Sequence, residues 1–196
     1  YQRLGKQLPR ARTRAPGAYV RHILSAELDD TVRKLLADLV RFQRRAFAAN
    51  PQRAKRRYVL GLREATKSLV ADNVRAVLLA PNIESIDAPG GLNDAVTQIV
   101  RLAARRHAPV MFVLTRARLG HAVEKRQKVS CVGILDSSGA EAHYKRALEL
   151  HKALRKQYLA AVRDADGDAD AVPPAVIDPR RAQRAAVRSA QQPQQP

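Results

Sequence analysis

The chain has 196 residues, and 36 Lys and Arg against 18 Asp and Glu give it a formal net charge of +18. Hydrophobic residues make up 45%, which is enough for one packed core and excludes wholesale disorder. The apolar runs are far shorter than the roughly 18 residues of a membrane-spanning helix, so we expect no span. So strong a positive charge predicts a polyanionic partner, since neutralised phosphates release counterions, but leaves RNA, DNA and acidic membrane open.

The charge and composition divide the chain into parts. Residues 1–57 carry 15 basic and 4 acidic side chains and residues 58–160 carry 16 and 9, whereas the remainder is balanced at 5 and 5. We expect residues 1–17 to be a basic, flexible arm. Residues 163–196 are rich in Asp, Ala, Pro and Gln and are predicted to be a disordered tail. The chain starts with Tyr, so we expect a fragment, and loss of a presequence stays open.

A helix is predicted over residues 27–48. Ser25 is placed to cap it, and Asn50 and Pro51 end it. One helix cannot bury an apolar stripe alone, so this helix must pack on the following segment or on a partner. The apolar side chains recur every three or four residues, at Leu28, Val32, Leu35, Leu39 and Phe42.

Short β-type runs alternate with helical patterns from residue 58 to residue 160. This alternation predicts an α/β sandwich. Two of the runs are almost continuously apolar, as expected for strands that are covered on both faces. The predicted strands are residues 58–60, 74–80, 110–114 and 129–135, and the predicted helices begin at Leu62, Gly91, Ala117 and Ala140.

Enzyme signals are weak throughout this α/β region. The glycine pair Gly90-Gly91 opens a helix but lacks the Lys of a phosphate loop and the third Gly of a dinucleotide fingerprint. Cys131 lies inside an apolar run, which favours a small buried side chain over a nucleophile. We therefore predict no catalysis, cofactor, metal or small-molecule substrate. Surface positions are expected for histidines that lack ligand spacing, namely His107, His121, His143 and His151.

The stretch from Lys55 to Lys67 is the most informative part of the chain, because a basic strand turns at Gly61 into a helix. A glycine there lets a nucleic-acid backbone approach the amides at a helix N-terminus. Glu64 and Lys67 are three apart and share a helix face. Glu64 can accept hydrogen bonds from base amino groups, and Lys67 can donate to guanine. The same spacing fits an ion pair on a solvated helix, and this alternative stays open.

Several motifs, in this order, resemble the kink-turn-binding ribosomal-protein superfamily, and within it the RNA-binding domain of the SECIS-binding proteins. That family recognises the selenocysteine insertion sequence (SECIS) in selenoprotein messages. The resemblance covers about residues 18–162 and extends upstream of the ribosomal members, which start near Lys55. The motifs are Gly61-Leu62-Arg63-Glu64-Ala65-Thr66-Lys67, Ala80-Pro81-Asn82, Gly90-Gly91-Leu92, Leu119-Gly120 and Val129-Ser130-Cys131-Val132-Gly133-Ile134, with Arg41-Phe42-Gln43 and Asn50-Pro51 upstream.

The resemblance implies a three-layer α/β/α sandwich with a four-stranded mixed sheet over residues 55–162, preceded by a helical SECIS-interaction-like segment at 18–54. In the superfamily the helix start enters the opened groove of a kinked stem with sheared G·A pairs. The common Asn of that motif is Arg63 here, which matches the SECIS-binding branch. The basic side chains Arg116 and Arg118 are our own inference as contacts to the RNA backbone.

These arguments give two sets of predicted residues. The predicted RNA-binding residues are Arg57, Gly61, Arg63, Glu64, Lys67, Arg116, Arg118, Lys128, Val129, Ser130 and Cys131. Residues implied in selectivity for SECIS RNA and the elongation factor are Arg41, Phe42 and Arg44, although Phe42 equally fits the end of the core stripe.

The function implied is binding of SECIS RNA in 3′ untranslated regions, in support of selenocysteine incorporation at UGA codons. The implied partners are SECIS RNA, the selenocysteine-specific elongation factor and the ribosome, with no membrane. We expect a cytoplasmic location, with shuttling to the nucleus left open. One alternative is a kink-turn protein of a ribosome or small ribonucleoprotein, against which the upstream extension and Arg63 argue. A nucleotide-handling α/β enzyme is the less favoured alternative.

Overall fold

A computed structural model describes residues 20–83 and 91–164, with side chains up to residue 161. The predicted arm at 1–17 and the predicted tail beyond residue 164 lie outside the described residues, as do Glu84 to Gly90. The domain boundaries given above therefore stay a prediction. No helix of the described ranges is long and apolar enough to cross a bilayer.

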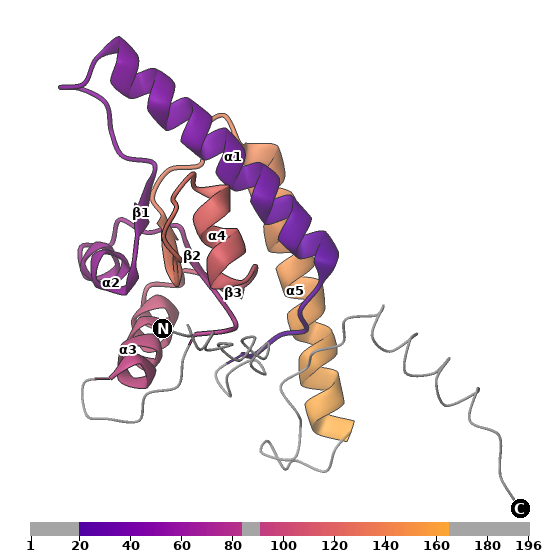
Figure 1. Cartoon of the computed structure of the whole chain (residues 1–196). Coiled ribbons are helices and arrows are strands. Elements are labelled where there is room, and N and C mark those ends of the chain that lie inside the picture. The colour runs from indigo at the N-terminus through magenta and orange to yellow at the C-terminus, as the bar shows by residue number, and fades with distance from the viewer. Residues whose placement is uncertain (1–19, 84–90, 165–196) are drawn as a thin grey trace, which may run out of the picture.

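Four strands form one mixed sheet (Figure 1), in the order β1-β4-β2-β3. The strand β4 is antiparallel to both β1 and β2, whereas β2 and β3 are parallel. All four predicted strands are present. The strands are β1 (Tyr58–Leu60), β2 (Ala76–Leu79), β3 (Val110–Phe112) and β4 (Cys131–Ile134).

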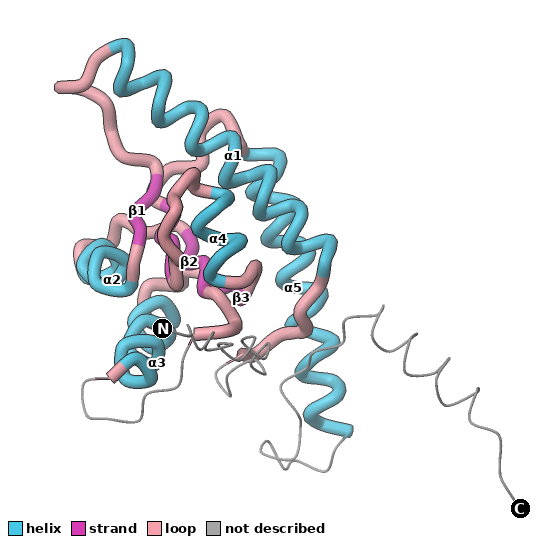
Figure 2. The backbone as a smooth tube through the Cα atoms, viewed as in Figure 1, coloured by secondary structure: helices cyan, strands magenta, loops and turns pink. Residues whose placement is uncertain are grey.

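In the described part of the chain, five helices cover the two faces of this sheet (Figure 2), which confirms the predicted α/β/α sandwich. On one face, α2 (Leu62–Val70) and α3 (Leu92–Arg105) pack against each other. On the other face lie α1 (Ala26–Ala49), α4 (Arg116–Ala122) and α5 (Glu141–Asp164), with α1 running along α5. Gly133 on β4 allows the close approach of α2, because a Cβ there would meet the Val59 side chain at 2.9 Å and lie 3.8 Å from Ala65.

The upstream helix α1 packs on the sandwich and has no separate core of its own. Ser25 caps it as predicted, because its hydroxyl accepts a hydrogen bond from the amide of Glu27. Burial of the predicted stripe gives the helix a large apolar face, which holds it on the sandwich. The predicted core positions Leu28, Val32, Leu35 and Leu39 are fully buried, and Phe42 packs at the margin of the same cluster.

The segment around the start of α1 also covers the open edge of β3. Among the described strands β3 pairs with β2 alone, so the amides of Phe112 and Leu114 need other acceptors. His22 Nε2 accepts from the Phe112 amide at 2.8 Å, while His22 Nδ1 lies 2.8 Å from the Ile23 carbonyl and therefore carries the proton. The Asp29 carboxylate accepts from the Leu114 amide at 2.7 Å, and burial raises its pKa.

The expectation of a surface position is wrong for His151, which is buried on α5. Its ring meets that of His22 edge to face at 4.9 Å between centroids. Burial lowers the pKa of His22, and burial together with the neighbouring His22 and Arg155 lowers the pKa of His151 to about 4. His151 lies four residues after Ala147 and seven before Tyr158, which are both buried, so it shares the buried face of α5.

Candidate nucleic-acid interface

The first wall of the candidate site is the turn from β1 into α2. Gly61 adopts φ 92° and ψ 158°, which a residue with a side chain rarely does. Its amide donates to the Cys131 carbonyl at 2.8 Å, so the turn is tied to the start of β4. No side chain caps the first amides of α2, which leaves the positive end of the helix dipole turned to the surface.

The second wall is the loop from Val123 to Ser130, which joins α4 to β4. The Lys125 amide donates to the Gly120 carbonyl at 2.9 Å, and the Val129 amide donates to the Arg116 carbonyl at 3.0 Å. A Cβ at Gly120 would lie 2.3 Å from the Gln127 carbonyl oxygen, so only glycine lets the loop fold this closely onto α4. The Leu119-Gly120 motif thereby acquires a physical role.

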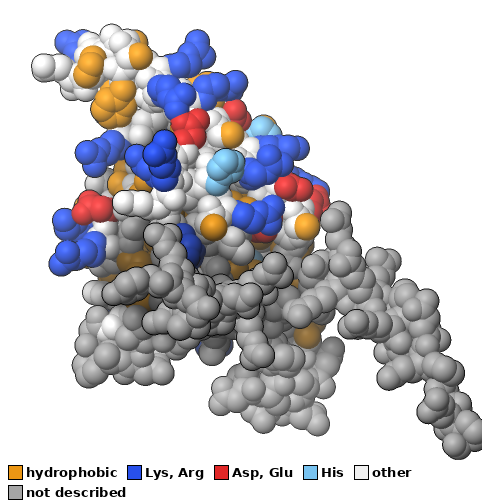
Figure 3. Space-filling model, viewed as in Figure 1, with side chains coloured by type: hydrophobic (Ala, Val, Ile, Leu, Met, Phe, Trp, Pro, Cys, Tyr) orange, Lys and Arg blue, Asp and Glu red, His pale blue; other side chains and the backbone are white. Residues whose placement is uncertain are grey.

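The two walls enclose an open hollow of about 520 Å³. Positions that are more than sixty residues apart in the sequence meet there, as the resemblance implies. Figure 3 shows that Lys and Arg side chains outnumber acidic ones on the face of the molecule seen there. The hollow is lined by Leu60, Gly61, Leu62, Arg63, Glu64, Lys125, Gln127, Lys128, Val129 and Ser130.

Glu64 and Lys67 form the ion pair that the spacing allowed as an alternative. Their charged atoms are 3.1 Å apart, and both side chains are exposed. An exposed pair of this kind contributes little to stability, so either side chain can exchange its partner for an RNA group at small cost. Glu64 lines the hollow, whereas Lys67 lies one helical turn beyond it.

Three of the predicted residues are placed less favourably for contact. Cys131 has to be removed from the predicted side-chain contacts, because it is fully buried on β4 and burial raises the pKa of its thiol to about 12. Val129 is largely buried but still lines the hollow. Arg57 lies at the other end of β1 from Gly61, where its guanidinium pairs with Asp136 at 3.4 Å.

The two basic residues inferred on α4 take different positions. Arg116 stands at the start of the helix, and its backbone carbonyl holds the loop through Val129. Arg118 is exposed but directed to α1, where it lies 3.5 Å from Asp29. Arg116 therefore lies next to the hollow, whereas Arg118 faces the covered side.

The predicted selectivity residues lie on the C-terminal half of α1. Phe42 packs at the joint between α1 and the sandwich, beneath the guanidiniums of Arg41 and Arg57 and against Gly139. Arg41 also pairs with Asp38 at 2.9 Å. Arg44 forms an ion pair with Glu124, the residue before the hollow-lining Lys125. The selectivity role of all three residues stays a prediction.

Sequence reasoning missed several residues of the hollow. Lys125 and Gln127 line it beside the predicted loop residues, and Leu60 and Leu62 supply an apolar floor. The signal for Lys125 was present in the sequence, because Lys125, Arg126 and Lys128 form a basic cluster before a strand. The place of the two leucines depends on how the turn at Gly61 is folded.

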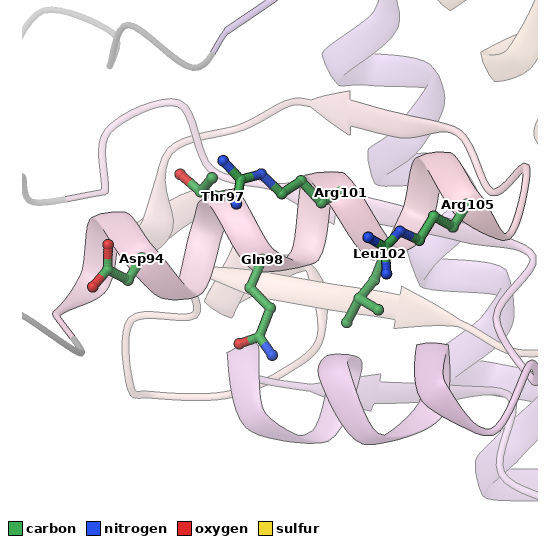
Figure 4. A pocket seen from close by; sticks show the side chains of 6 residues that line it. All are labelled: Asp94, Thr97, Gln98, Arg101, Leu102 and Arg105. Carbon is green, nitrogen blue, oxygen red and sulfur yellow. The ribbon is translucent and has the colours of Figure 1, made fainter.

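Another hollow lies along α3, and Figure 4 shows the side chains that line it. None of the predicted RNA-binding residues takes part in it. In the described parts of the chain, no group of His, Cys, Asp and Glu is arranged to hold a metal ion. The hollow on α3 is lined by Asp94, Thr97, Gln98, Arg101, Leu102 and Arg105.

The chain is similar in sequence to known RNA-binding proteins. A model of the ribosomal protein L7Ae/L30e/S12e/Gadd45 family matches residues 48–143. Selenocysteine insertion sequence-binding protein 2-like of Mus musculus is 41% identical over 142 residues, which are 71% of this chain and 13% of that protein. Selenocysteine insertion sequence-binding protein 2 of Rattus norvegicus is 38% identical over 152 residues, which are 76% of this chain and 18% of that protein.

The structural comparison supports the same fold. A 15.5kD RNA binding protein of Giardia lamblia superposes with a TM-score of 0.50 at 15% identity, covering 67% of this chain and 93% of the other. The chain spans less than a fifth of the length of these curated relatives. The activity of a whole relative is therefore not assigned to this chain by the similarity. Residues 48–143 are thus similar to the ribosomal protein L7Ae/L30e/S12e/Gadd45 family, and the predicted resemblance to the SECIS-binding proteins is confirmed.

Proposed function

We propose that this chain binds the SECIS stem-loop of selenoprotein messages and thereby supports incorporation of selenocysteine at UGA codons. The observation that carries the proposal is the hollow in which Gly61, Arg63 and Glu64 meet Lys128 and Ser130. These are the positions that the SECIS-binding resemblance assigns to RNA. The similarity of 38–41% to proteins named for SECIS binding supports the same assignment.

The chemistry of the hollow suits a kinked RNA. The amides at the start of α2 and the surrounding Lys and Arg favour phosphate, and Arg63 adds a donor at the entrance. Glu64 is repelled by phosphate but accepts hydrogen bonds from exposed base edges. The apolar side chains of Leu60, Leu62 and Val129 offer a surface for an extruded base. The combination fits a non-enzymatic binding module.

The proposal includes partners and a location. We expect the selenocysteine-specific elongation factor and the ribosome as protein partners, and a cytoplasmic site of action with nuclear shuttling left open. The second candidate is a kink-turn protein of a ribosome or small ribonucleoprotein, which the family match by itself favours equally. The upstream helix and Arg63 favour the SECIS function.

The test is a titration of the chain against three RNAs at near-physiological salt. The RNAs are a SECIS stem-loop, the same stem with its G·A pairs converted to Watson-Crick pairs, and a ribosomal kink-turn. The salt concentration has to stay near the physiological value, because a net charge of +18 makes any RNA bind when the salt concentration is low. Tight binding to the first RNA alone supports the proposal.

Two other outcomes would contradict it. Tighter binding to the ribosomal kink-turn would favour the second candidate, because discrimination would then rest on the kink alone. Equal binding to all three RNAs would mean that the positive charge acts without base recognition.

A further inference from the structure

Glu124 stands at the end of α4 in a backbone conformation that suits glycine better. Its φ is 55°, in the left-handed region, and its amide donates to the His121 carbonyl at 3.0 Å. The next amide, that of Lys125, returns to Gly120, so the helix ends in a tight turn. Glycine or asparagine fits such a position with less strain, so a glutamate there calls for a reason beyond folding.

The side chain of Glu124 supplies that reason. Its carboxylate pairs with Arg44 on the C-terminal half of α1, eighty residues away in the sequence. Burial and the charge of Glu124 raise the pKa of the Tyr58 hydroxyl at the start of β1, while the charge of Arg44 lowers it. Glu124 thus joins α1 to the loop just before Lys125, Gln127 and Lys128.

The buried side chains of Val123 and Val129 hold the two ends of the loop in the core. Its backbone is fixed at Gly120 and Arg116, while Lys125, Gln127 and Lys128 are exposed and line the hollow. A carboxylate among these basic side chains repels phosphate. It therefore weakens RNA binding unless it also positions the basic side chains of the loop.

We propose that Glu124 is a positioning residue for RNA binding, which through Arg44 holds the basic loop from Lys125 to Lys128 in register with the turn at Gly61. The inference rests on the proposed function and deepens it. The upstream helix then influences RNA selectivity by orienting the loop, and Arg44 acts through the Glu124 carboxylate.

The sign of one substitution separates this role from plain electrostatics. If charge alone matters, Glu124→Gln removes a negative charge beside RNA and tightens binding. If Glu124 positions the loop, the same change weakens binding to the SECIS stem-loop, and we expect a loss of about 3- to 10-fold.

Asp72 offers a matched control. It also has a left-handed backbone, with φ 58°, and it forms an exposed ion pair with Arg106 at 3.6 Å. It lies beyond the C-terminal end of α2, about 13 Å along the helix from the hollow. We expect Asp72→Asn to change the affinity for the SECIS stem-loop less than twofold. The melting temperatures of the Asp72→Asn and Glu124→Gln variants should be close to each other.

A charge exchange supplies the second test. Arg44→Glu alone places two carboxylates together and adds a negative charge near RNA, and we expect the largest loss of affinity. The double variant Arg44→Glu with Glu124→Arg rebuilds the pair in reverse. We expect it to bind within about threefold of the parent, which a purely structural effect of either side chain would not produce.

The outcomes for this inference and for the proposed function are distinct. If the parent chain does not discriminate the SECIS stem-loop from its G·A-converted stem, the proposed function fails. If the parent discriminates but Glu124→Gln binds as tightly as the parent or tighter, the positioning role is overturned. Failure of the reversed pair to recover affinity, with all variants folded, would overturn it as well.

Discussion

The two ends of the sheet treat their backbone groups in opposite ways. At the β3 edge the chain satisfies its own amides, because His22 and Asp29 accept from Phe112 and Leu114 in a covered environment. At the turn from β1 into α2, no side chain caps the helix and the surrounding basic residues are exposed. Side chains of this protein therefore close the β3 edge to further pairing, whereas the turn from β1 into α2 stays accessible to a partner.

The largest expected effect is on the closed edge. Replacing His22 with Ala leaves the Phe112 amide without its acceptor and opens a cavity, so we expect a loss of about 3 kcal/mol in the free energy of unfolding. Denaturant unfolding measures it. The exposed His121→Ala is the control and should cost less than about 0.5 kcal/mol. Equal losses in the two variants would show that the His22 contact does not close the edge.

The next effect is on the open corner. We expect Glu64→Ala to lower affinity for the SECIS stem-loop by about 1–3 kcal/mol, because a base contact is lost, while stability is unchanged. Titration at near-physiological salt measures it. Glu149→Ala, which breaks a similar exposed pair with Arg146 on α5, is the matched control and should bind like the parent. Unchanged or tighter binding by Glu64→Ala would show that no base is read there.

Acidification separates the two regions further. The folded-state pKa of His151 is about 4, below its ordinary 6.5, so between these values the unfolded chain binds the extra proton. Stability therefore falls as pH decreases through this range, by about 2 kcal/mol between pH 7 and pH 5. Burial also lowers the pKa of His22, so His22 contributes to the pH dependence with the same sign. Arg155 lines the recess at this edge, and its charge further disfavours the protonated form of both histidines.

Thermal unfolding from pH 7 to pH 5 tests this statement, with His151→Gln as the reference. We expect a shallower pH dependence in the variant than in the parent. Parallel curves for the two proteins would mean that His151 is not held neutral by its buried site.

The smallest expected effect comes from Arg118, which lies between the two regions. Because it is exposed and pairs with Asp29, we expect Arg118→Ala to change stability by less than about 0.5 kcal/mol and RNA affinity less than twofold. The salt dependence of RNA binding is the sharper measurement. A slope of log affinity against log salt that falls by about one would restore Arg118 as a phosphate contact.

The sequence predicted the elements well because their signals are local. The apolar period of α1, its Ser25 cap and the glycine at position 61 depend on neighbours within a few residues. The ends of strands were less accurate: residues 74–80 were predicted where β2 spans Ala76–Leu79. A strand ends where its partner ceases to pair, and that is decided by the partner's register.

Some residues of the candidate site were likewise predicted from the sequence, and others were placed only by the structure. Sequence motifs and the resemblance they carry located Gly61, Glu64 and Ser130, which the structure brings to one hollow. The apolar run around Cys131 predicted its burial, and the predicted strand at 58–60 already separated Arg57 from Gly61, but the ion pair of Arg57 with Asp136 could not be read from the sequence. Strand pleating and strand direction decide which side chains reach the surface, and neither is visible in a one-dimensional pattern.

Taken by itself, the sequence determined the charge, the order of helices and strands, and the glycines that make tight turns possible, because each depends on residue type and short-range spacing. Tertiary structure alone decided which distant groups meet: His22 with Phe112, Asp29 with Leu114, and Arg44 with Glu124. These contacts close over eighty to ninety residues of chain. Their existence depends on how the packed layers bring segments together once the apolar faces are buried.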